Sequence, residues 1–88
     1  MEDTDKVIFV AGKPFGVYNK AILMALEKHK KITVKTRWKH ILSAVNIVTF
    51  LARIEKLKIE ETKLGGSLLK GKDDKERHIP EIEIIVTE

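Results

Sequence analysis

The sequence contains no cysteine, which excludes a disulfide, a thiolate metal site and a cysteine nucleophile. A chain without cysteine is typical of an intracellular protein, so we expect a cytoplasmic location. No apolar run approaches the roughly 18 residues of a membrane-spanning helix. The first residues, Met1-Glu2-Asp3-Thr4-Asp5, are acidic rather than basic. We therefore expect neither a signal peptide nor a membrane anchor.

Amide side chains are also scarce. Glutamine is absent, asparagine occurs only as Asn19 and Asn46, and charged residues, mainly Lys and Glu, make up 34% of the chain. This composition favours a thermophilic source. A chain of 88 residues forms one small domain, which buries only about two-thirds of the surface that its unfolded chain exposes. We therefore expect a single domain over residues 1–88, and we expect it to self-associate.

Positive charge is in modest excess, with 17 Lys and Arg against 13 Asp and Glu, a net charge of +4. Residues 28–39 contain six basic side chains and no acid. The acids are concentrated elsewhere, in Glu2, Asp3, Asp5, Glu60, Glu61, Asp73, Asp74, Glu81, Glu83 and Glu88. This separation predicts a basic surface facing an anion, with the acids on a different face.

The hydrophobic periodicity predicts six elements in the order βαβαββ. The expected strands cover residues 6–11, 31–37, 56–64 and 79–87, and the expected helices cover residues 14–29 and 39–55. The alternation slips near Glu60-Glu61, which indicates a β-bulge. Pro80 fits an edge or the start of a strand. The order predicts an α/β two-layer sandwich in which two helices pack on a mixed four-stranded sheet.

The second expected helix is apolar on most of its circumference. Its apolar side chains are Ile41, Leu42, Ala44, Val45, Ile47, Val48, Phe50, Leu51 and Ile54. Such a helix needs cover on two sides, and one small domain supplies cover on one side only. We therefore predict that a second subunit buries part of this helix.

A glycine-rich and charged segment, residues 65–77, connects the last two expected strands. It is too long for a tight turn, and a long loop in a small domain is often functional or disordered. We expect a flexible hairpin arm whose basic side chains reach along a nucleic-acid groove: Lys70, Lys72, Lys75 and Arg77. Asp73, Asp74 and Glu76 nearly cancel these charges, so a merely solvated loop tip is the alternative.

Gly12-Lys13-Pro14 lies where the first strand meets the first helix. We expect Gly12 to allow a tight turn, Pro14 to occupy the first helical position, and Lys13 to point outward beside a helix start. Such a corner suits a phosphate. A structural turn with a solvated lysine is the competing interpretation.

The segment Arg37-Trp38-Lys39-His40 lies at the end of a strand and the start of a helix. Exposed amides and the helix dipole add to its positive charge, so Arg37 and Lys39 are candidates to bind phosphates. Trp38 could stack on a base or a sugar. Its alternative role is to cover the end of the core, and for His40 the structural interpretation is the favoured one.

The sequence argues against catalysis. His29, His40 and His78 have no spacing that would bring two of them together as metal ligands. Ser43 and Ser67 lack an evident base, and Gly12-Lys13 does not satisfy a P-loop. We expect no enzyme activity, no metal and no cofactor.

Four local features resemble the Alba family of small basic archaeal chromatin proteins, over essentially the whole chain. Gly12-Lys13-Pro14 with Tyr18 resembles the family's Gly-Lys-Lys-Pro corner, which precedes an Asn-Tyr pair. Residues 37–45 resemble its Arg-Gly-Arg-x-Ile-x-x-Ala-Val segment, with Arg37, Ile41, Ala44 and Val45 retained. Gly65 or Gly66 with Ser67 resembles the opening of its long hairpin, and Arg77 with residues 81–84 resembles the close.

The chain departs from the family pattern at several of these positions. It has only one lysine at the corner, and Val17, Trp38, Lys39 and Asn46 stand where the pattern has Asn, Gly, Arg and Asp. The chain is thus identified as a divergent member. The resemblance implies a dimer that binds DNA or RNA across a basic body while two hairpin arms reach into flanking minor grooves.

The leading hypothesis is a sequence-independent binder of double-stranded DNA that compacts the chromosome as a homodimer, or as a heterodimer with a paralogue. The site residues that it implies are Lys13, Tyr18, Arg37, Trp38, Lys39, Lys70, Lys72, Lys75 and Arg77. The first alternative is an RNA-binding member acting on structured RNA or in a ribonucleoprotein. A second alternative is a protein-interaction or scaffolding subunit, and a small hydrolase of the acylphosphatase kind is a distant further one.

Overall fold

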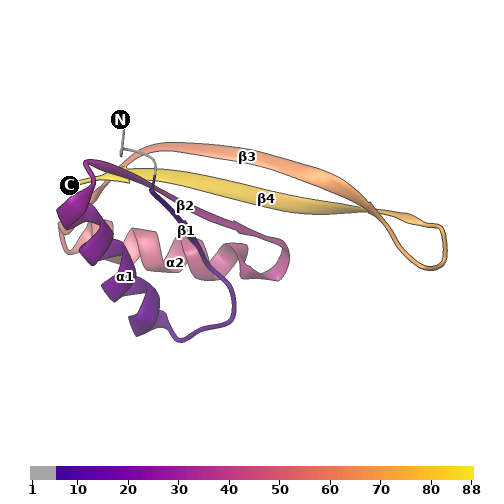
Figure 1. Ribbon diagram of the computed structural model, residues 1–88, viewed down its shortest axis with the longest axis horizontal. Helices are drawn as coiled ribbons and strands as arrows, with labels where there is room; N and C mark the ends of the chain where they lie inside the picture. Colours follow the sequence, from indigo (N-terminus) through magenta and orange to yellow (C-terminus); the bar gives the residue numbers. More distant parts are fainter. Residues whose placement is uncertain (1–5) are drawn as a thin grey trace.

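Both helices of the protein pack on the same face of a single sheet (Figure 1). The computed structural model describes residues 6–88, so the acidic residues Glu2, Asp3 and Asp5 lie outside the described residues. The elements in residues 6–88 are β1 (Lys6–Phe9), α1 (Phe15–Lys28), β2 (Lys31–Arg37), the 3-10 turn η1 (Trp38–His40), α2 (Ile41–Arg53), β3 (Lys58–Lys70) and β4 (Glu76–Thr87). No helix among them has the length and apolarity to cross a lipid bilayer.

The sheet is mixed, with the strand order β1-β2-β4-β3. β1 runs parallel to β2, whereas β4 pairs antiparallel with both β2 and β3. The expected α/β two-layer sandwich, with the order βαβαββ and a mixed four-stranded sheet, is therefore confirmed. Because β1 and β2 are parallel, their carboxyl ends lie at the same end of the sheet. The two basic segments, residues 12–14 after β1 and residues 37–40 at the end of β2, therefore begin at this end.

Strand alternation assigns the side chains of β2 to the two faces. Ile32, Val34 and Thr36 are buried beneath the helices, while the side chains between them point to the face that the helices leave uncovered. We call this second face the open face. The helices contribute Tyr18, Ile22, Ala25, Leu26, Ala44, Ile47, Val48 and Leu51 to the core. The core thus lies between one sheet face and the inner sides of α1 and α2.

The connection between the last two strands differs from the sequence expectation. β3 and β4 continue as a two-stranded ribbon, paired up to Lys70 and Glu76, and this ribbon extends well past the helices (Figure 1). The flexible loop expected over residues 65–77 is wrong in extent, because only residues 71–75 lie outside the strands. The expected hairpin arm is present, and it is an extended β-ribbon.

Two details of the sheet agree with the sequence. The register of β3 against β4 shifts between Ile59 and Glu61, so the expected bulge is present. Pro80 directly precedes Glu81, which is the first residue of β4 that pairs with β2. At Pro80, β4 therefore pairs with β3 only, which is the edge position where a proline is tolerated.

α2 ends in a Schellman motif, in which a glycine is usual. Glu55 N donates to Ala52 O at 3.0 Å, and Lys56 N donates to Leu51 O at 2.9 Å. These two bonds require a left-handed residue at the first position after the cap, and Glu55 has a φ of 61° there. A side chain with a β-carbon at such a φ is strained by about 1 kcal/mol.

Glu55→Gly is expected to stabilise the protein by about 1 kcal/mol, since glycine adopts this conformation without steric strain. For a domain of this size the change corresponds to a rise in Tm of about 4–8 °C, measured by thermal unfolding. Glu55→Ala is the matched control, because it removes the same charge but keeps a β-carbon. An equal rise in both variants would assign the gain to the charge at the helix end instead.

Candidate nucleic-acid interface

The corner between β1 and α1 is held by a buried tyrosine. Tyr18 is 5% exposed, and its hydroxyl oxygen accepts hydrogen bonds from Ala11 N at 2.8 Å and Lys13 N at 3.1 Å. The backbone of Lys13 is thereby tied to α1, while its side chain is exposed. Tyr18 is thus a buried residue that positions the backbone of Lys13.

Two sequence expectations about this corner are wrong. No glycine within residues 6–88 has a positive φ, and a β-carbon on Gly12 would meet nothing within 4 Å, so the turn does not require glycine there. Pro14 is the N-cap residue in an extended conformation, and the helix begins at Phe15. The Val17 N–H donates to Pro14 O at 3.1 Å. The corner is therefore shaped by the Tyr18 hydroxyl and by Pro14 rather than by Gly12.

The second basic segment follows β2 at the same end of the sheet. Arg37, Trp38 and Lys39 are all exposed, and His40 is half-buried at the start of α2. Neither Arg37 nor Lys39 forms an ion pair with another residue of the described chain. The segment presents two unneutralised cations beside a helix start, an arrangement that favours anion binding.

Trp38 lies in an unusual backbone conformation. Its φ is 61°, in the left-handed region that glycine favours, and its side chain is 49% exposed. A bulky residue in this region is a conformational outlier, strained by about 1–2 kcal/mol. This position is the one where the Alba pattern has glycine. The tryptophan is therefore placed at the surface at a conformational cost, and it does not simply fill the core.

The basic segment 28–39 does not form one continuous cationic surface. Lys31 Nζ lies 2.7 Å from Glu60 Oε1, and Lys35 Nζ lies 3.5 Å from Glu83 Oε2. Alternation along β2 turns both lysines to the open face, where β3 and β4 supply the carboxylates. The expectation that the acids lie on a separate face is therefore wrong. Of the cations on or directly after β2, Arg37 and Lys39 remain to face an anion, while Lys28 and Lys30 are exposed near the opposite end of the sheet.

The hairpin arm carries both signs of charge. Lys70 Nζ lies 3.3 Å from Asp74 Oδ1, and Arg77 Nη2 lies 3.8 Å from Asp73 Oδ2. All four side chains are at least 47% exposed, so each pair contributes little to stability. Lys72 and Lys75, also exposed, make no ion pair within the described chain. Of the four basic residues expected on the arm, two are thus partly neutralised by neighbouring acids.

Three large apolar side chains form an exposed strip along α2 and its C-cap, interspersed with the exposed polar residues Ser43, Asn46 and Arg53. Leu42, Phe50 and Ile54 are 68%, 42% and 44% exposed, whereas the opposite side of the helix is buried. The Phe50 ring also meets the Phe15 ring edge-on, with centroids 5.5 Å apart. The expectation of an apolar side left uncovered by the domain itself is confirmed. The strip is defined here as the Leu42-Phe50-Ile54 face.

Sequence reasoning missed one feature of this region. Phe9, on β1, is 66% exposed on the open face, and Lys35 Nζ lies 5.9 Å from its ring centroid. The alternation of β1 assigns Phe9 to one face, but the partner strand follows only from the parallel pairing of Phe9 with Lys35. The exposed aromatic ring thus belongs to the same sheet end as the two basic segments.

Comparison with known proteins identifies the family. No family model matches the chain. Alba from Thermoplasma volcanium has 30% sequence identity and a TM-score of 0.80, covering 94% of this chain and 100% of the other. ALBA1 from Trypanosoma brucei has a TM-score of 0.79 over 94% of this chain and 68% of the other, and its 16% identity supports the fold alone. The fold and the level of identity to the Thermoplasma protein over its full length show that the chain belongs to the Alba family.

Proposed function

We propose that this chain, as a single domain, is a dimeric, sequence-independent binder of double-stranded DNA. In this role it packages the chromosome of an archaeal cell in the cytoplasm, without catalytic activity or a cofactor. The observation that carries the proposal is the placement of the Lys13 corner and the Arg37–Lys39 segment at one end of the sheet, without ion-pair partners in the described chain.

The body of the protein would hold the phosphate backbone. Lys13, Arg37 and Lys39 supply three exposed cations, and Arg37 can form a bidentate contact with a phosphate. Such contacts depend on charge and spacing and carry no base information, so the binding is independent of sequence. Tyr18 takes part by fixing the backbone of Lys13.

The arm would extend the contact along the duplex. The ribbon projects beyond the body (Figure 1), with Lys70, Lys72, Lys75 and Arg77 near its end. A narrow β-ribbon with basic side chains fits a DNA groove. Lys72 and Lys75, which have no carboxylate partner in the described chain, are the cations most available for phosphates.

Dimerisation is part of the proposal because one chain offers few phosphate contacts. The Leu42-Phe50-Ile54 face is apolar and exposed, and a second copy that covers it would double the number of basic segments. Two linked sites bind one duplex much more tightly than either site alone. A homodimer is the simplest form, and a paralogue with a matching apolar face would give a heterodimer.

The test is the salt dependence of duplex binding. If a dimer engages about six to ten phosphates, the affinity for a short DNA duplex should fall by about three to five decades between roughly 50 and 200 mM salt. Fluorescence anisotropy on a labelled duplex measures this slope, and a second duplex of scrambled sequence measures the lack of sequence preference. Affinity that does not change with salt would contradict the proposal.

A second candidate, binding of structured RNA, is favoured by Trp38. A half-exposed tryptophan that stays in a strained conformation between Arg37 and Lys39 is suited to stack on an unpaired base. Competition between a DNA duplex and a structured RNA of equal length distinguishes the two candidates. Preferential displacement by the RNA, lost in Trp38→Gly, would select the RNA candidate.

A further inference from the structure

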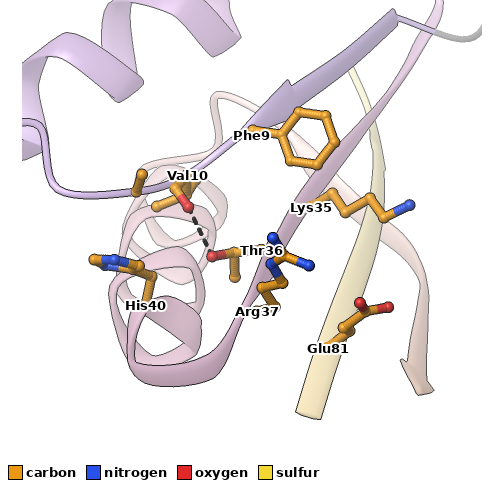
Figure 2. Close-up of a pocket in the computed structure, with 8 residues that line it drawn as sticks. Phe9, Val10, Lys35, Thr36, Arg37, His40 and Glu81 are labelled. Carbon is orange, nitrogen blue, oxygen red and sulfur yellow. Dashed lines mark hydrogen bonds between the residues drawn. The ribbon is translucent and has the colours of Figure 1, made fainter. Parts of the chain in front are cut away.

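A pocket of about 470 Å³ opens between the two basic segments, at the end of β1 and β2. Its lining comes from three strands and η1: Phe9, Val10, Ala11, Lys35, Thr36, Arg37, His40 and Glu81. In Figure 2 the Phe9 ring lies between β1 and β2, the side chains of Lys35 and Glu81 lie to the right of it, and His40 lies at the left, beyond Thr36. The volume suits a single small organic group.

The pocket exists because β1 stops pairing with β2 before β2 itself ends at Arg37. The last backbone bond between them joins Val10 N to Lys35 O at 2.9 Å, after which the chain turns away through Ala11. The Thr36 hydroxyl donates to Val10 O at 2.7 Å and fixes the point of departure. Arg37 lies beyond this point, so it borders the pocket where a further residue of β1 would otherwise pair.

The lining combines three kinds of group. The Phe9 ring, 66% exposed, provides a flat apolar wall. Arg37 provides a cation, and it lies directly across from Glu81, which provides an acceptor-only carboxylate. Lys35 is engaged with Glu83 and lies over the Phe9 ring, so it neutralises the second nearby acid. A flat ligand with hydrogen-bond donors on its edge and a phosphate attached matches this set.

We propose that this pocket binds one unpaired nucleobase that carries an exocyclic amino group, a guanine, adenine or cytosine. The inference rests on the proposed function and adds a ligand to it. The base stacks against Phe9, its amino group donates to the Glu81 carboxylate, and its phosphate meets Arg37. Thymine and uracil lack an exocyclic amino group, so they make a poorer match to Glu81.

The base belongs to a strand and not to a free nucleotide. Lys13 follows the lining residue Ala11 by two positions and Lys39 directly precedes the lining residue His40, so both cations are available for the phosphates before and after an extruded nucleotide. Extrusion of a paired base is unfavourable by a few kcal/mol, and it is least so for a base that is already unpaired. A bulged or mismatched nucleotide within a bound duplex is therefore the expected occupant.

The experiment compares three short DNA duplexes that share one sequence: fully paired, with one bulged guanine, and with one bulged thymine. Fluorescence anisotropy gives the Kd of each with the wild-type dimer. We expect the bulged guanine duplex to bind about tenfold more tightly than the paired duplex, an effect typical of base–aromatic stacking. The bulged thymine duplex should gain clearly less.

Phe9→Ala should remove the preference for the bulged guanine and leave the Kd of the paired duplex unchanged. Val7→Ala is the matched control, because Val7 is also exposed on β1, at 42%, but does not line the pocket. Glu81→Gln, whose amide both donates and accepts, should reduce the discrimination between bulged guanine and bulged thymine. Thermal unfolding of each variant confirms that the fold is retained.

Equal affinity of the wild-type protein for all three duplexes, with the salt dependence intact, would overturn the pocket inference alone. An equal loss on paired and bulged duplexes in Phe9→Ala would also overturn it. Binding of guanosine monophosphate as tight as that of the bulged duplex would contradict the strand as the source of the base. Absence of binding to any duplex would overturn the proposed function, and the pocket inference with it.

Discussion

Replacing Lys13 and Arg37 together by glutamate is expected to weaken duplex binding by about a hundredfold or more at moderate salt. Each residue is exposed and forms no ion pair within the described chain, so its charge is available to the ligand. In a dimer the double variant removes four phosphate contacts, and the salt slope should decrease by about 4. A salt series by fluorescence anisotropy measures both quantities.

Lys30→Glu combined with Lys58→Glu is the matched control. Both lysines are exposed: Lys30 directly precedes β2 and Lys58 begins β3, near the opposite end of the sheet. The control changes the net charge by the same amount, so it separates a local contact from a general attraction. If the control loses as much affinity as Lys13→Glu with Arg37→Glu, net charge and not the basic corner explains binding. If neither loses affinity, a protein partner should be sought on the Leu42-Phe50-Ile54 face.

Leu42→Glu combined with Phe50→Glu is expected to convert the proposed dimer into a monomer. Both side chains are exposed in the single chain, at 68% and 42%, so the substitutions remove little of the monomer's own core. In a dimer they would place buried, unpaired carboxylates in an apolar interface, which is strongly unfavourable. Light scattering coupled to size exclusion measures the mass, and the affinity for duplex should fall about a hundredfold as two linked sites become one.

Met24→Glu serves as the control for this experiment. Met24 is 52% exposed on α1 and lies off the Leu42-Phe50-Ile54 face. The Met24→Glu variant should keep the mass of the proposed dimer and bind duplex as the wild type does. A dimeric mass for the Leu42 and Phe50 double variant, with a retained fold, would place the interface on another surface.

The parts of the fold that pack on the core were predictable from the sequence. β2 occupies residues 31–37 as expected, because Ile32, Val34 and Thr36 alternate with side chains on the open face. The second helix was expected to retain an exposed apolar side, and Leu42, Phe50 and Ile54 form that side. In both cases a buried surface imposes a period on the sequence.

The ribbon was less predictable for the same reason. Nearly every residue of β3 is exposed, and beyond Pro80 the only buried side chain of β4 is Ile79. Without a buried face, no alternation of apolar and polar residues is needed, so residues 65–77 read as a loop. Only pairing with β4 makes this part of β3 a strand.

Some features of the candidate site were likewise predictable from the sequence, and others were not. Lys13 and Arg37 could be selected from local sequence, since each lies where a strand ends and a helix follows. The ion pair of Lys31 with Glu60 could not be predicted from local sequence, because it depends on how strands that are distant in sequence pair. The pocket beside Phe9 depends likewise on the parallel pairing of β1 with β2. Contacts between strands that are remote in sequence carry no local signal.

The ion pairs near the arm tip reduce what the arm contributes to the salt dependence of the proposed complex. Lys70 and Arg77 lie beside Asp74 and Asp73, so these parts of the arm bring almost no net charge to the duplex. A phosphate that meets such a pair keeps most of its counterions, because only an unbalanced cation displaces them. In the proposed complex, the two ion pairs near the tip can thus lengthen the footprint without adding to the salt slope, which Lys72, Lys75 and the cations of the body would set. The footprint length and the salt slope would then not change in proportion to each other.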